Sequence, residues 1–105
     1  MAPGRIVAIV AALMLAMSVS ANAATIQVTM QDLVISPAEA SAKVGDTIEW
    51  INKDIFAHTA TARNGDWDVM MPPNKTVTSV LNKAGTVEYY CRFHPNMNAT
   101  LVIAP

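Results

Sequence analysis

From residue 24 onward the chain contains several short segments in which apolar and polar residues alternate. Alternation with a period of two places every second side chain on the same face of a β-strand. Other segments are rich in the β-branched and aromatic residues that strands favour. The sequence therefore predicts about eight short strands, at residues 25–30, 33–35, 40–44, 47–50, 58–62, 76–80, 86–91 and 100–104.

Turn-forming residues separate these segments, and no amphipathic helix is predicted among them. The clearest turn signals are residues 44–46, 64–66, 72–73 and 83–85, which contain Gly, Pro, Asn or Asp. We therefore expect an all-β fold, a small Greek-key β-sandwich or barrel formed by a single domain at residues 24–105. Its core is expected to contain Ile26, Val28, Ile48, Trp50, Val80, Val87, Leu101 and Ile103.

The first 23 residues have the features of a secretory signal peptide. Arg5 precedes an apolar run at residues 6–17, and Ala21-Asn22-Ala23 has the small-x-small pattern of a signal-peptidase site. We predict a signal peptide at residues 1–23, cleavage after Ala23, a periplasmic protein and no stable membrane association after cleavage. An uncleaved anchor is the alternative, although the apolar run is shorter than the ~20 residues that a transmembrane helix needs.

The charge balance excludes some classes of partner. The net charge is -1 and only 14% of the residues are charged, so no basic patch for nucleic acid is expected. We expect a monomer that binds no nucleic acid.

Residues 91–97 place the single cysteine, a histidine and a methionine at regular three-residue intervals, as Cys91, His94 and Met97. The second histidine of the chain, His58, lies at the start of another predicted strand. One thiolate, two imidazoles and a weak axial thioether form the donor set of a blue-copper site. We predict one type 1 copper per chain, bound by these four residues. The alternative is that Cys91 and Met97 only fill space in the core.

This donor set favours an electron carrier over an enzyme. Pro95 restricts the backbone around His94, so the donors are expected to be held rigidly before metal binds. A rigid site changes little when copper changes oxidation state, which makes electron transfer fast. Two histidines leave no ligands for a further catalytic copper, and one cysteine excludes a thiolate-bridged binuclear centre. A periplasmic copper carrier or chaperone is the rival hypothesis, although such proteins use open, exchangeable sites.

Several motifs resemble the cupredoxins, and most of all the amicyanins, in which the histidine and methionine are closely spaced as they are here. Plastocyanins and pseudoazurins have a longer gap at that point. The motifs that carry the resemblance are residues 44–46, 49–52, His58, residues 70–72, residues 84–86 and residues 90–97. The resemblance implies that His58, Cys91 and His94 are equatorial copper ligands and Met97 the axial one. It also implies a mobile periplasmic carrier that transfers single electrons from a quinoprotein dehydrogenase to a c-type cytochrome.

Two residues beside His58 differ from the family pattern. Thr59 stands where cupredoxins usually have Asn, and Ala57 stands where amicyanins have Pro. The Thr59 hydroxyl can still connect the two ligand loops, with a geometry that differs from that of the Asn side chain. We also expect electrons to pass through the edge of His94, inside an apolar patch that includes some of Met70, Met71, Pro72, Phe93 and Pro95.

Overall fold

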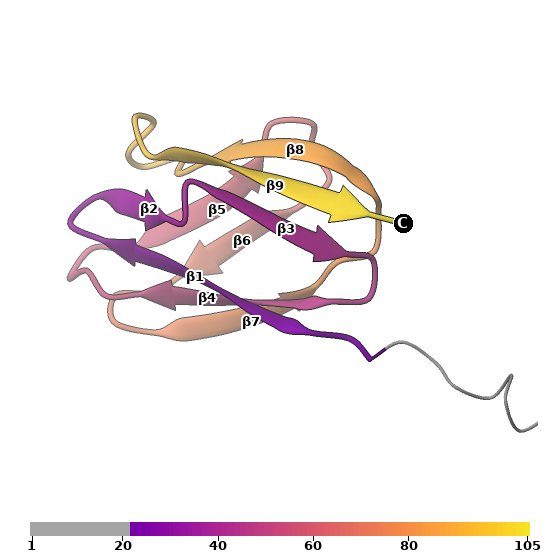
Figure 1. Cartoon of the computed structure of the whole chain (residues 1–105). Coiled ribbons are helices and arrows are strands. Elements are labelled where there is room, and N and C mark those ends of the chain that lie inside the picture. Colours follow the sequence, from indigo (N-terminus) through magenta and orange to yellow (C-terminus); the bar gives the residue numbers. More distant parts are fainter. Residues whose placement is uncertain (1–21) are drawn as a thin grey trace, which may run out of the picture.

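The computed structural model describes residues 22–105, which form a sandwich of two β-sheets (Figure 1). The predicted signal peptide therefore lies outside the described residues except for Asn22 and Ala23. Residues 22–105 contain no helix with the length and hydropathy that a membrane crossing requires. The strands are β1 (Thr25–Gln31), β2 (Val34–Ser36), β3 (Glu39–Lys43), β4 (Thr47–Asn52), β5 (His58–Ala62), β6 (Asp68–Met71), β7 (Thr76–Val80), β8 (Gly85–Tyr90) and β9 (Asn98–Ala104).

The chain passes from one sheet to the other several times along its length. This arrangement confirms the predicted Greek-key sandwich. One sheet has the order β2-β1-β4-β7 and the other β3-β9-β8-β5-β6. The pairs β1/β4 and β3/β9 are parallel, and the other pairs are antiparallel. Parallel neighbours cannot be joined by a tight hairpin, so the chain must cross between the sheets at their ends.

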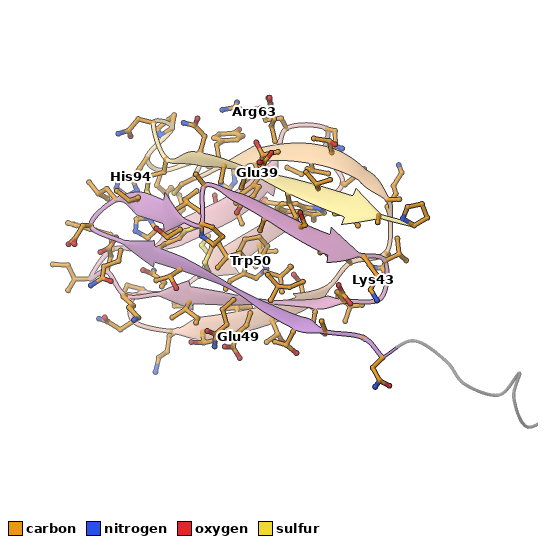
Figure 2. All side chains as sticks on the ribbon, viewed as in Figure 1. Glu39, Lys43, Glu49, Trp50, Arg63 and His94 are labelled. Atoms are coloured by element: carbon orange, nitrogen blue, oxygen red, sulfur yellow. The ribbon has the colours of Figure 1, made fainter. Side chains whose placement is uncertain are left out.

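These crossings bring several loops together at one end of the sandwich. The β1–β2, β4–β5 and β8–β9 connections lie together at the left of Figure 1, and the C-terminus lies at the opposite end, where β1 also begins. Figure 2 shows His94 at the left end and Lys43 at the right end. The predicted ligand loop is therefore far from the point where the described chain begins.

Alternating side chains of both sheets fill the space between them. Trp50 lies at the centre, between the sheets in Figure 2, and its ring packs against Tyr89 at 5.5 Å and Trp67 at 5.6 Å between ring centroids. The indole N–H of Trp50 donates to Ser79 Oγ at 2.8 Å, so this buried polar group has a partner. Val28, an inward-facing residue of β1, is fully buried and adds to the core.

All eight predicted strands are present, with ends that differ by two residues or fewer. One strand, β6, is missing from the prediction because its sequence, Asp68-Val69-Met70-Met71, ends in three consecutive apolar residues and does not alternate. Cys91 is the first residue after β8 and not the last residue of the strand. The prediction that Val80 is a core residue is wrong, because Val80 is 56% exposed while Val77 and Ser79 point inward.

Candidate metal centre

The side chains of His58, Cys91 and His94 converge at the loop end of the sandwich. Their donor atoms all lie within 4.8 Å of one another. Cys91 Sγ is 3.6 Å from His58 Nδ1 and 3.7 Å from His94 Nδ1. Metal bonds of about 2.0 Å to nitrogen and 2.3 Å to sulfur, separated by ~120°, would place the two donors roughly 3.7 Å apart. The observed spacing therefore fits one metal ion between the three side chains.

The local fold of residues 91–97 explains why their donors are regularly spaced. His94 N–H donates to the Cys91 carbonyl at 3.3 Å, and Met97 N–H donates to the His94 carbonyl at 2.9 Å. Each of these two successive turns connects one potential ligand to the next, the first from Cys91 to His94 and the second from His94 to Met97. Cys91 N–H then donates to the Met97 carbonyl at 3.0 Å and closes the loop. The Met97 side chain is 2% exposed, so its thioether is held in the interior of this end of the sandwich.

Asp54 determines which nitrogen of His58 can bind a metal. His58 Nε2 lies 2.7 Å from Asp54 Oδ2, and the imidazole is fully buried. Burial raises the pKa of the Asp54 carboxyl, but the hydrogen bonds from His58 and from the backbone N–H groups of Asp32 and Leu33 outweigh this effect and lower it. An ionised carboxylate can only accept, so Nε2 carries the proton. The Nδ1 atom, which faces Cys91 Sγ, keeps its lone pair for a metal.

A buried asparagine holds the loop that carries Asp54. Asn52 is 2% exposed, and its side-chain amide donates to the carbonyls of Phe56 at 2.8 Å and Met71 at 3.2 Å. Its Oδ1 atom accepts from Asp54 N–H at 2.9 Å. The connection from β4 to His58 is thus fixed at both ends by one side chain.

Thr59 connects the two segments that carry the donors. Its backbone N–H donates to Cys91 Sγ at 3.4 Å, and its Oγ1 accepts from Arg92 N–H at 2.8 Å. The Thr59 hydroxyl also lies 2.9 Å from Thr61 Oγ1, whose proton is donated to Asp68 Oδ1 at 2.7 Å. Because Thr61 has no second proton, Thr59 must donate to Thr61. The proton of this buried hydroxyl and one of its acceptor positions therefore both have defined partners.

Residues 4–103 match the family described as a cupredoxin-like domain. The chain is a cupredoxin. Members of this family are copper-binding electron carriers, and His58, Cys91 and His94, with Met97 nearby, form a candidate donor set of the type 1 kind in this cupredoxin.

Amicyanins are among the relatives of this cupredoxin. The amicyanin of Paracoccus denitrificans is 31% identical over 74 residues and that of Paracoccus versutus 27% identical over 71 residues. Both alignments cover 62% of this chain and 54% of the relative, so the chain spans about half the length of the curated relatives it matches.

Solved structures extend the likeness over more of the chain. The crystal structure of Paracoccus versutus amicyanin superposes with a TM-score of 0.64 at 26% identity and covers 84% of this chain and 87% of that one. A reduced amicyanin variant superposes with a TM-score of 0.63 at 30% identity, covering 84% and 88%. A purple cupredoxin from Nitrosopumilus maritimus shares the fold at 21% identity, with a TM-score of 0.65 and coverage of 75% and 99%. Other similar amicyanin structures are in the Cu(I) form.

The contacts of Thr59 confirm the expectation that its hydroxyl joins the two ligand segments of this cupredoxin. The hydroxyl does so by accepting from Arg92 N–H, next to Cys91. The hydrogen bond to the cysteine sulfur comes from the Thr59 main chain and so does not depend on the side chain.

An apolar surface surrounds His94, which is the only partly exposed member of the histidine and cysteine donor group. The Phe56 ring centroid is 5.9 Å from that of His94. We call Ile55, Phe56 and Phe93 the apolar rim, and their exposed fractions are 75%, 51% and 47%. The expectation for Phe93 is confirmed, and Met70, Pro72 and Pro95 are also exposed. Met71 is fully buried, because it faces inward opposite His58 in the β5–β6 pair, so it is not one of the residues that form the exposed patch.

Sequence reasoning missed Asp54, Ile55 and Phe56. The signal for the two apolar residues was present, since they are adjacent in a turn-like segment directly before His58. The Asp54 carboxylate lies four residues before His58, but that spacing has no fixed meaning outside a helix. Only the folded β4–β5 connection brings it to the imidazole.

Proposed function

We propose that this chain is a periplasmic blue-copper electron carrier that moves single electrons between a donor protein and an acceptor protein. In the proposal, His58, Cys91 and His94 are the equatorial ligands and Met97 is the axial ligand. The observation that carries it is the convergence of the one thiolate and the two imidazoles at distances that suit a single metal ion.

Protein contacts, and not the metal alone, define the positions of the donors. The hydrogen bond from His58 to Asp54 orients one imidazole, and the turns of residues 91–97 orient the other. The Thr59 N–H bond to Cys91 Sγ stabilises negative charge on the sulfur. Bound copper supplies a one-electron redox couple. Because the donors are fixed by their surroundings, they move little when the charge of the site changes.

Electrons would enter and leave through the edge of His94. Its imidazole reaches from the buried sulfur of Cys91 to the apolar rim, which makes a short route from the centre to a docked partner. A small apolar face suits transient contacts that dissociate quickly. The likeness to amicyanin favours a quinoprotein dehydrogenase as donor and a c-type cytochrome as acceptor.

The proposed location follows from the N-terminal sequence. Residues 1–23 act as a signal peptide in this proposal, and residues 24–105 are the exported cupredoxin domain. The exported domain is a monomer without stable membrane association, binds no nucleic acid and is not an enzyme.

A periplasmic copper carrier or chaperone is the alternative function. The burial of His58 and Cys91, each with an exposed fraction of 0%, favours the electron carrier because a protein that hands over its metal needs accessible ligands. A competition experiment separates the two. Rapid transfer of Cu(I) from the loaded domain to a chelator or an acceptor protein would favour the chaperone.

The visible absorption spectrum of the copper-loaded domain tests the ligand set. Cu(II) in the wild type should give an intense blue charge-transfer band from the thiolate, and the Cys91→Ser variant should lose it. Met97→Gln should keep a blue-type band but lower the reduction potential, because the axial ligand tunes it. Met70→Gln changes an exposed methionine outside the proposed ligand set and should alter neither quantity. A colourless Cu(II) wild type would refute the proposal.

A further inference from the structure

The carboxylate of Asp46 binds the backbone at Ala24, near the start of the described residues and at the end of the sandwich opposite the candidate metal centre. Its Oδ1 atom accepts a hydrogen bond from Ala24 N–H at 2.8 Å, and Oδ2 accepts from Lys43 N–H at 2.8 Å. Asp46 is 2% exposed although it carries a formal charge. These two backbone donors lower the pKa of the Asp46 carboxyl, so it is ionised at neutral pH.

The turn between β3 and β4 aims this carboxylate at Ala24. Asp46 N–H donates to the Lys43 carbonyl at 3.0 Å, and Gly45 within the turn has a φ of 94°, a conformation that glycine adopts without steric cost. Thr47 N–H donates to the Ala24 carbonyl at 2.9 Å. Both the nitrogen and the oxygen of Ala24 are therefore bound by the β3–β4 region, although Ala24 precedes β1.

The chain before Ala24 makes no comparable contact among the described residues. Asn22 and Ala23 are exposed and line a surface pocket of about 270 Å³ together with the β3–β4 turn and Pro105. Figure 1 shows the chain leaving the sandwich directly before β1. The Ala23–Ala24 peptide bond thus lies where the hydrogen bonds to the β3–β4 region begin.

We propose that Asp46 is a receptor for a new N-terminus, formed when the Ala23–Ala24 peptide bond is hydrolysed during export. Water adds across the bond, so that Ala23 leaves with a carboxylate and Ala24 keeps a free amine that takes up a proton. The neutral N–H that faces Asp46 becomes an ammonium group, and a hydrogen bond becomes an ion pair. This inference rests on the signal peptide in the proposed function.

The position of Asp46 favours one cleavage point over its neighbours. Cleavage after Asn22 would leave an amide at Ala24 and place the ammonium one residue away from the carboxylate. Cleavage after Ala24 would remove both the donor to Asp46 and the acceptor for Thr47 N–H. Only cleavage after Ala23 puts the new charge at the atom that Asp46 already contacts.

The first experiment determines the N-terminus of the exported protein. The full chain is expressed with its own N-terminal segment, and the periplasmic product is analysed by intact mass and N-terminal sequencing. A product that begins at Ala24 is expected. A periplasmic product that begins at any other residue would overturn the assignment of the cleavage point.

The second experiment measures the ion pair and does not depend on export. Domains that begin at Ala24 or at Ala23 are released from a fusion partner and compared by thermal unfolding. We expect the Ala24 form to unfold about 4 °C higher. Acetylation of its N-terminus should abolish the difference, because the acetyl group restores a neutral amide without altering Asp46.

The Ala24 and Ala23 forms are then compared again in the Asp46→Asn variant. The difference between the Ala24 and Ala23 forms should vanish in Asp46→Asn and persist in Glu39→Gln, which changes a carboxylate at the other end of β3. Equal stability of the two wild-type forms, or a difference that survives acetylation, would refute the receptor role even if Asp46→Asn does not fold. Failure of the blue spectrum would instead refute the proposed function and leave this result intact.

Discussion

Asp54 Oδ2 accepts a hydrogen bond from His58 Nε2 at 2.7 Å, and the same carboxylate accepts from the backbone N–H groups of Asp32 and Leu33. One side chain therefore joins the β1–β2 turn to an imidazole of the candidate metal centre. The two turn residues have positive φ angles of 54° and 61°, so the carboxylate also supports a backbone conformation that is uncommon outside glycine. The orientation of His58 is thus tied to a part of the chain that contributes no metal ligand.

Replacement of Asp54 should weaken copper binding without removing a ligand. In Asp54→Ala, His58 loses the acceptor that fixes its proton on Nε2, and copper affinity should fall roughly 10- to 100-fold. Competition with a copper chelator measures the change. Glu88→Ala removes an exposed carboxylate from β8 and should leave the affinity unchanged. Equal affinities in the two variants would mean that Asp54 supports only the turn.

Thr59 should contribute to stability through its hydroxyl. Thr59→Val leaves the Arg92 N–H without its acceptor and should cost about 1 to 3 kcal/mol in the free energy of unfolding. Thr59→Ser keeps the hydroxyl and should lose less, and denaturant unfolding of both variants measures the difference. The N–H bond to Cys91 Sγ comes from the main chain, so the blue band should remain in both. A valine variant as stable as the serine variant would contradict this account.

The copper-free domain should be folded. Its core includes fully buried Trp50 and Tyr89 and does not depend on the metal site. Copper that binds only the native state should then raise the unfolding temperature with increasing free metal concentration. Circular dichroism with and without a chelator tests both statements. A random-coil spectrum for the copper-free domain would show that this fold needs its metal.

Acid should destabilise the copper-free domain partly through Asp46. The pKa of its carboxyl is lowered in the fold by the N–H groups of Ala24 and Lys43. Its stabilising contribution is complete above the ordinary carboxyl pKa of about 3.9 and is lost as the pH falls through the lower folded value. Denaturant midpoints should therefore fall with pH below about 4, and less steeply in Asp46→Asn. Parallel curves for the two proteins would exclude this contribution.

The apolar rim should determine how fast partners exchange electrons. Phe93→Lys places a charge beside His94 and should slow the bimolecular reaction with a c-type cytochrome roughly tenfold, which equals about 1.4 kcal/mol of docking free energy. Stopped-flow kinetics measures this rate. Val80→Lys is a matched control, because Val80 is comparably exposed, at 56%, but lies on β7. Equal slowing in both variants would place the docking face elsewhere.

Much of this protein could be predicted from the sequence because the necessary signals are local. Strand positions follow from alternation within five or six residues, and the turns follow from Gly, Pro, Asn and Asp between them. The spacing of Cys91, His94 and Met97 is also local, since two successive turns place the donors on one loop. His58 could be chosen without knowing the fold because the chain contains only one other histidine.

The remaining features were decided by tertiary structure, because they depend on which segments the sheets bring together. Alternation alone could not tell whether Val80 or Ser79 faces the core, and the register of β7 against Trp50 turned the serine inward. His58 and Cys91 are 33 residues apart and meet only because the β4–β5 and β8–β9 connections share one end of the sandwich. From the sequence alone, Asp54 and Asp46 would be taken for ordinary surface aspartates. In the fold, Asp54 binds the His58 imidazole of the candidate metal centre and the backbone N–H of Asp32, and Asp46 binds the backbone N–H of Ala24 before β1.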